Sequence, residues 1–166
     1  MGNFDETNQE SIAHFVISHM QQHSLLALGT VNSEGYPWLV CLNLYFDPHG
    51  TIYWKSQKSA EHSKNIERNP HVSICVFSRA KETGDFGFYS YALAHEMKED
   101  ELHNYMDLRY TKNGEEAPDS SIFLGESTNR VYCAQLTEAW VNDERHIKQR
   151  VDLDTLRKAA SHHEKN

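Results

Sequence analysis

The sequence has few cysteines and no long hydrophobic run. Its three cysteines, Cys41, Cys75 and Cys133, are widely spaced and form no C-x-x-C pair. Each lies in an apolar, strand-like segment, which favours buried, reduced thiols over disulfide or metal chemistry. The mean hydropathy of -0.70 argues against a membrane-spanning helix. No secretory signal follows Met1, so we expect a cytoplasmic protein without a membrane partner.

Positive charge is also scarce. The chain has 16 Lys and Arg residues against 24 Asp and Glu residues, which gives a formal net charge of -8 at pH 7. The basic residues are dispersed, whereas nucleic-acid binding needs them clustered on one face, so we expect no nucleic-acid partner. A ligand with one phosphate is not excluded, because a local group of donors is enough to hold it.

Signatures of several enzyme classes are missing as well. There is no G-x-S-x-G elbow, no G-x-x-x-x-G-K-[ST] loop and no G-x-G-x-x-G fingerprint. No pair of carboxylates is marked as an acid/base couple, so catalytic residues stay unassigned. His19 and His23 are four residues apart and could share a metal ion on one helix face, but no third ligand is spaced to complete a site. We therefore expect no metal.

What the sequence does contain is a succession of β-rich segments between turn residues. Strands are predicted at residues 25–31, 36–46, 51–56, 71–77, 86–97 and 130–141. Alternation in residues 86–97 predicts that Phe86 and Phe88 face one side and Tyr89 and Tyr91 the other. Polar turns are expected over 79–85 and 142–145.

Helices are predicted around these strands. Capping-box spacing from Thr7 to Glu10 precedes apolar residues at helical intervals, which indicates a helix over 8–22. A second helix should end at Asn69-Pro70 and a third should cover 98–110, followed by a loop over 111–121. We expect one domain over 1–166, with the N-terminal helix, a small closed or partly closed barrel over 24–153, and a C-terminal helix and tail over 154–166.

Polar residues gather where the strand at 51–56 leads into the second helix. Free backbone N–H groups and the positive end of the helix dipole should point to the same place. The donors there are Lys55, Ser56, Lys58, Ser59, His62 and Lys64. The sequence therefore predicts an anion site at this junction.

The same part of the chain resembles the FMN-binding split-barrel family typified by pyridoxamine 5'-phosphate oxidase. The resemblance rests on Gly35-Tyr36-Pro37, on Tyr53-Trp54-Lys55-Ser56 and on the run from Ala60 to Pro70, with a weaker likeness over 131–143. It implies a mainly β fold with flanking helices, a six-stranded antiparallel split β-barrel. It also implies a homodimer that holds FMN in the grooves between subunits.

The resemblance further implies which residues contact the cofactor. The phosphate would be held by Lys55, Ser56, Ser59, His62 and Lys64. The ring would lie along the second and third strands, near Leu39, Val40, Cys41, Leu42 and Trp54. Trp140 of the partner chain could close the pocket. Aromatic residues beyond the needs of one small barrel also favour a homodimer: Trp38, Tyr53, Trp54, Phe88, Tyr89, Tyr91 and Trp140.

Two functions from different classes follow. The first is a flavin-dependent oxidoreductase acting on a small molecule, in which FMN carries the chemistry. The second is a non-catalytic binder or sensor of flavin, heme or another planar ligand, or a member that has lost FMN. Ala60-Glu61 stands where relatives most often have Ser-Arg, and a carboxylate beside a phosphate would be repelled by roughly 1 to 4 kcal/mol. Glu61 thus favours the second function and the surrounding donors favour the first.

Overall fold

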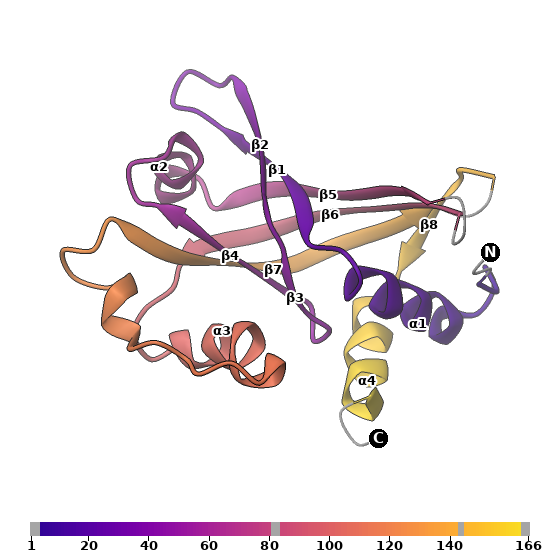
Figure 1. The fold of residues 1–166 in the computed structure, drawn as a ribbon. Coiled ribbons are helices and arrows are strands. Elements are labelled where there is room, and N and C mark those ends of the chain that lie inside the picture. The colour runs from indigo at the N-terminus through magenta and orange to yellow at the C-terminus, as the bar shows by residue number, and fades with distance from the viewer. Residues whose placement is uncertain (1–3, 81–83, 143–144, 164–166) are drawn as a thin grey trace.

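The protein is built around one curled antiparallel sheet (Figure 1). The computed structural model describes residues 4–80, 84–142 and 145–163. Within these residues the sheet has eight strands in the order β2-β1-β5-β6-β7-β4-β3, with β8 paired to β7. The bounds are β1 Leu25–Val31, β2 Pro37–Asn43, β3 Tyr45–Asp47, β4 Thr51–Gln57, β5 His71–Ala80, β6 Gly84–Glu96, β7 Asn129–Asn142 and β8 Lys148–Val151.

The mainly β, antiparallel split-barrel fold is confirmed, but the expected count of six strands is wrong. The strand expected over 36–46 is interrupted at Leu44, because the chain pairs with β1 as far as Asn43 and with β4 from Tyr45 onward. It therefore forms β2 and β3 separately. The other additional strand, β8, pairs with the end of β7 from Ala139 to Asn142.

The sheet curls because its two edge strands, β2 and β3, are almost continuous in the chain. Strand β7 is long enough to pair with β4 through its first half and with β8 through its second half, on the same edge. Its other edge pairs with β6, with an irregularity between Tyr91 and Ala92 that adds local bending. The result is a half-barrel with a concave inner face and a convex outer face.

Four helices flank the sheet in the described part of the chain. They are α1 Gln9–Met20, α2 Glu61–Arg68, α3 Leu102–Arg109 and α4 Leu153–His163. In Figure 1, α1 and α4 lie together at one end of the sheet and α2 and α3 at the other. None of the described helices is long and apolar enough to cross a membrane.

Some predicted boundaries differ from the structure. Helix α3 begins at Leu102 rather than at residue 98, because Glu101 accepts the N–H of Lys98 and closes a turn before the helix. The expected loop over 111–121 contains a 3-10 turn at Thr111–Asn113 and leads into another at Ser120–Phe123. The turns expected over 79–85 and 142–145 and the C-terminal tail lie partly outside the described residues.

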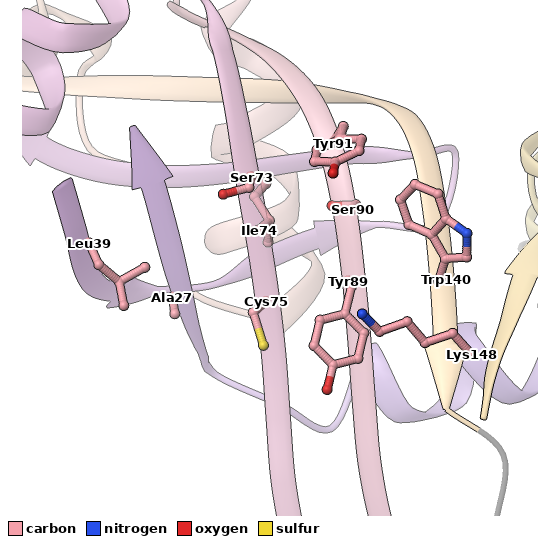
Figure 2. Close-up of a pocket in the computed structure, with 10 residues that line it drawn as sticks. All are labelled: Ala27, Leu39, Ser73, Ile74, Cys75, Tyr89, Ser90, Tyr91, Trp140 and Lys148. Carbon is pink, nitrogen blue, oxygen red and sulfur yellow. The ribbon is translucent and has the colours of Figure 1, made fainter. Parts of the chain in front are cut away.

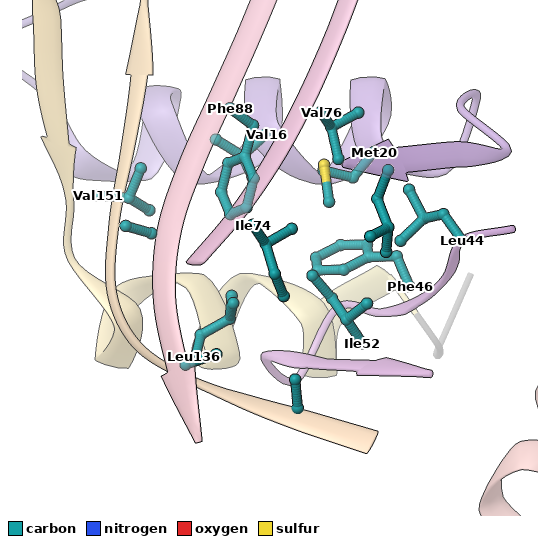
Figure 3. Close-up of a cluster of buried hydrophobic side chains, with 14 of the residues drawn as sticks. Val16, Met20, Leu44, Phe46, Ile52, Ile74, Val76, Phe88, Leu136 and Val151 are labelled. Atoms are coloured by element: carbon teal, nitrogen blue, oxygen red, sulfur yellow. The ribbon is translucent and has the colours of Figure 1, made fainter. Parts of the chain in front are cut away.

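The inner face of the half-barrel holds the main core. Alternate residues of β6 confirm the predicted alternation, since Phe86 and Phe88 are buried while Tyr91 is exposed. Helices α1 and α4 cover this face, and Figure 3 shows Val16 and Met20 of α1 among the strand side chains. Burying an apolar side chain of this size contributes about 1.5 to 3 kcal/mol, so this face supplies most of the driving force for folding.

A second, smaller core lies on the outer face. It is formed by outward residues of β4 and the first half of β7 packing against α3 and the 3-10 turn at Ser120–Phe123. Its members are Tyr53, Met97, Leu102, Tyr105, Met106, Phe123, Val131 and Cys133. The connection between β6 and β7 therefore covers part of the outer face.

Candidate functional site

The predicted anion site lies where β4 leads into α2. Helix α2 has Ala60 as its N-cap, and no described side chain caps it. By contrast, Asn8 caps α1 by accepting the N–H groups of Glu10 and Ser11. Because a helix start leaves N–H groups without intrahelical acceptors, the first turn of α2 keeps donors available for an anion.

A short hydrogen bond joins β4 to the first turn of this helix. The Oγ of Ser56 lies 2.6 Å from Nε2 of His62. The side chain of His62 is buried, and this burial lowers the pKa of its imidazole below the ordinary 6.5. The imidazole is therefore neutral at pH 7, and we assign the hydroxyl as donor to Nε2, which places the imidazole proton on Nδ1.

Two further hydrogen bonds fix the position of α2. Ser63 donates through Oγ to the carbonyl of Gln57 at 2.8 Å, which ties the helix to the end of β4. The fully buried Asn65 donates through Nδ2 to Oγ1 of Thr30 at 3.0 Å, which ties it to β1. The helix start is thus held rigidly against two strands that are far apart in the sequence.

The remaining predicted phosphate residues surround this point at the surface. The side chains of Lys55, Ser59 and Lys64 are exposed, and Glu61 is half-buried. The structure therefore brings Ser56 and His62 into direct contact and leaves the lysines free to turn toward a ligand.

Arg130 is a buried cation next to this site that sequence reasoning missed. It is the register partner of Ser56 and is only 5% exposed. Its guanidinium donates to Glu96 at 2.8 Å and to the carbonyls of Gly125, Ser127 and Asn129. These bonds show that Arg130 holds the chain before β7 in place. The sequence placed Arg130 at the start of a predicted strand, but it gave no sign that Arg130 pairs with Ser56.

The predicted ring residues lie on two strands with unpaired edges. Strand β2 pairs only with β1, and β4 pairs with β3 only as far as Tyr53, among the described residues. Leu39 and Cys41 are exposed on the outer face, whereas Val40 and Leu42 pack against the core. These edges leave backbone N–H and C=O groups available for a planar ligand.

The predicted ring residue Trp54 has a different environment. Its side chain is fully buried and stacks on Tyr132, with ring centroids 5.9 Å apart. Only the backbone of Trp54 is therefore positioned to contact a ligand.

A pocket of about 250 Å³ lies on the outer face of the sheet (Figure 2). Trp140 and Leu39, both predicted ring residues, line it from β7 and β2. Trp140 packs edge-on against Tyr91 with centroids 5.5 Å apart, and Nζ of Lys148 lies 4.4 Å from the ring centroid of Tyr89. None of the predicted phosphate residues lines this pocket, so within one chain the predicted site residues form two groups.

The outer face around this pocket is apolar and exposed. Leu25 is 60% exposed and Phe77 59% exposed. Of the aromatics expected to favour a homodimer, Tyr53, Trp54 and Phe88 are buried within the chain, whereas Trp38 and Tyr91 are exposed. Several large exposed apolar side chains on one face are typical of a surface that contacts another molecule.

The cysteines differ in exposure. The expectation that all three are buried is wrong for Cys41, which is exposed because it points outward from the edge strand β2, and is met only in part by Cys75, which is half-buried. Cys133 is buried 3.4 Å from Nε2 of His95, which is paired with Glu101 at 2.9 Å. Burial raises the pKa of Cys133 to about 12, so its thiol is protonated and a poor nucleophile. In the described part of the chain, no group of three acidic, cysteine or histidine residues could hold a metal ion.

Comparison of the sequence with protein-family models gives one match. The model described as pyridoxamine 5'-phosphate oxidase matches residues 15–132, which include α2, the preceding strands and the start of β7. The comparison with curated proteins finds no match.

Comparison of the fold with solved structures finds similar half-barrels. A heme-binding protein from Mycobacterium smegmatis has a TM-score of 0.69 at 15% identity, over 91% of this chain and 60% of that chain. This chain thus spans 60% of the length of that protein. A putative pyridoxamine 5'-phosphate oxidase from Listeria innocua has a TM-score of 0.59 at 17% identity, over 78% and 97% of the two chains. HutZ, the heme storage protein from Vibrio cholerae, has a TM-score of 0.57 at 20% identity, over 74% and 88%.

Proposed function

This chain belongs to the pyridoxamine 5'-phosphate oxidase family, and from that membership we propose that it binds FMN and acts as an oxidoreductase on a small molecule. Family members with this fold include both oxidase-like and heme-binding proteins, so the family alone does not decide the ligand. The observation that carries the proposal is the junction of β4 and α2, where an uncapped helix start meets Ser56, His62 and exposed lysines.

The donors at this junction fit a phosphate monoester. The first-turn N–H groups of α2 offer neutral hydrogen bonds, and Lys55 and Lys64 offer charged ones. The two charged donors, at about 1.5 to 3 kcal/mol each, together outweigh a repulsion of about 1 to 4 kcal/mol from one half-buried carboxylate. Glu61 precedes His62 directly, and successive helix residues do not share a face. Its carboxylate can therefore point away from the anion.

The ring would lie against the unpaired edges of β2 and β4. There the backbone near Leu39 to Leu42 and near Trp54 offers hydrogen-bonding groups in a regular row. Leu39 and Trp140 lie on the outer face, in a pocket that none of the predicted phosphate-binding residues lines. The site is therefore complete only if a second copy of the chain supplies the outer-face residues. We therefore propose a homodimer packed through the exposed apolar face, with Trp140 of one subunit closing the groove of the other.

The chemistry would come from the bound flavin, which supplies reversible hydride and electron transfer. The residues of this chain would hold the phosphate, align the ring along the strand edges and exclude water from one face. The substrate would be a small molecule that stacks on the exposed face of the ring.

The alternative is a non-catalytic binder of heme or another planar ligand. It is supported by the fold similarity to two heme-binding proteins and by the 11 histidines of the sequence. In this case the apolar outer face and the strand edges would hold the planar ligand, and the phosphate donors would be solvated surface groups.

The decisive experiment is reconstitution of the purified protein with excess FMN followed by desalting. We expect the flavin absorbance to remain with the protein, and His62→Ala and Lys64→Ala each to weaken FMN binding by about 1.5 to 3 kcal/mol. A parallel reconstitution with heme serves as the comparison. Loss of all FMN on desalting, with heme retained, would establish the alternative. Variants that bind FMN as tightly as the parent would place the phosphate elsewhere.

A further inference from the structure

We propose that the buried Ser56–His62 pair makes the phosphate site selective for a dianionic phosphate monoester, because binding charges His62 by uptake of one proton. This inference rests on the proposed FMN function and specifies which form of the ligand the site accepts. It concerns the two side chains joined at 2.6 Å between β4 and the first turn of α2.

Without a ligand, the pair is arranged for a neutral imidazole. His62 is only 6% exposed, and in the tautomer assigned above Ser56 supplies the hydrogen bond that its Nε2 accepts. Burial disfavours the charged imidazole and lowers its pKa. A neutral imidazole with a lone pair at Nε2 presents an acceptor to an incoming phosphate, which is itself an acceptor.

Binding of a dianion reverses this preference. With both ring nitrogens protonated, Nε2 becomes a donor, and the hydroxyl of Ser56 is released to donate to a phosphate oxygen. The low dielectric around a buried group that disfavours an isolated charge also strengthens its attraction to an opposite charge. A dianion therefore compensates most for the cost of charging His62. A monoanionic ester compensates less, and an unphosphorylated ligand does not compensate at all.

Among the charged and titratable groups around His62, protonation of His62 itself is the main change expected on binding. On its own helix these are Glu61, Lys64, Glu67 and Arg68, none of which is buried. Among the elements that pack against α2, β1 has no titratable side chain, Cys41 of β2 lies on the outer face, and Glu96 of β6 is paired with Arg130. The other groups at this end of the sheet are Lys55, Lys58, Arg130 and Tyr132.

Isothermal titration calorimetry of FMN binding in buffers of different ionisation enthalpy measures this proton directly. At pH 7.5 a phosphate monoester, with a second pKa of about 6, is already mostly dianionic, so proton uptake reports on the protein. We expect an uptake approaching one proton for FMN and none for riboflavin. The affinity for FMN should fall with rising pH above 7, by up to about tenfold per pH unit.

Selectivity is tested with riboflavin 5'-sulfate, a monoanionic isostere of FMN. The parent should prefer FMN over this isostere by about tenfold or more, since the charged hydrogen bonds depend on the dianion. His62→Gln keeps a polar side chain opposite Ser56 but takes up no proton, so both the uptake and most of the preference should disappear. The matched control Lys64→Gln should weaken FMN binding while the uptake persists.

The outcomes separate this inference from the proposed function. FMN binding without proton uptake, or uptake that persists in His62→Gln, overturns the inference and leaves the FMN function intact. Failure of the parent to bind FMN at any pH between 6 and 8 overturns both.

Discussion

The two halves of the outer face of the sheet differ in whether other segments of the chain cover them. On β4 and the first half of β7, outward residues such as Tyr53 and Val131 are buried beneath α3 and the 3-10 turn at Ser120–Phe123. On β1, β5 and β6, outward residues such as Leu25, Phe77 and Tyr91 are equally apolar but more than half exposed.

The difference shows where the chain supplies its own cover and where it does not. The 97–128 connection folds back over one half and buries it, and no described segment does the same for the other. Since large exposed apolar patches are rare on monomers, the uncovered half is the surface through which we propose that two copies associate. The comparison therefore separates residues that stabilise the fold from residues that stabilise the assembly.

The largest effect should come from the covered half. Phe123 is 2% exposed and packs edge-on against Tyr105, so Phe123→Ala should lower the free energy of unfolding by about 3 to 5 kcal/mol, as measured by urea denaturation. The neighbouring Ile122 is 45% exposed, and Ile122→Ala should cost less than about 1 kcal/mol. Equal losses from the two variants would show that the covered half is not a packed core.

A smaller effect, on assembly rather than on folding, is expected in the uncovered half. Phe77→Glu places a charge on the exposed apolar surface and should weaken association by about 2 kcal/mol or more, roughly 30-fold in Kd. Light scattering across a dilution series measures the change, and circular dichroism should show an unchanged fold. Ile122→Glu is the matched control and should associate like the parent. A parent that is monomeric at micromolar concentration would contradict the proposed homodimer.

The smallest expected effect is a dependence of stability on pH, and it comes from two histidines on the inner side of the sheet. Burial lowers the pKa of His19 and of His62 below the ordinary 6.5, so between the lowered values and about 6.5 the unfolded chain binds more protons than the folded one. Stability should therefore fall as pH drops below about 6.5, with little change in association. The lowered carboxyl pKa values, such as that of Asp152, act only at lower pH.

Denaturation at pH 7.5, 6.5 and 5.5 checks this expectation. The double variant His19→Gln and His62→Gln should show a shallower loss of stability than the parent. A parent that is as stable at pH 5.5 as at pH 7.5 would mean that neither imidazole is held neutral by the fold.

Much of the fold could be predicted because its signals are local. The turn residues from Asn32 to Gly35 and from Asp47 to Gly50 separate strands at nearly the predicted positions, and β1 spans the predicted residues. Alternation in β6 identified its two faces correctly. The break at Leu44 was missed because β-forming residues lie on both sides of it, and only the pairing of β2 with β1 and of β3 with β4 shows where the strand divides.

The candidate site could be predicted only in part. The strand end and the helix start near Ser56 and His62 were visible from turn residues and helical spacing. The absence of a cap at Ala60, the burial of His62 and the position of Arg130 beside Ser56 depend on which strands become neighbours. Similarly, Trp54 is as aromatic as Trp38 in sequence, yet one is fully buried and the other 46% exposed.

By itself, the sequence determined most of the strands, the helix that follows β4 and the two faces of β6, because turn chemistry and side-chain periodicity act over a few residues. Only the tertiary structure decided which outward face is covered, which strand edges stay open and which imidazole is buried against a hydroxyl. These properties depend on contacts between segments far apart in the chain, such as β4 with β7, and local patterns carry no information about that pairing.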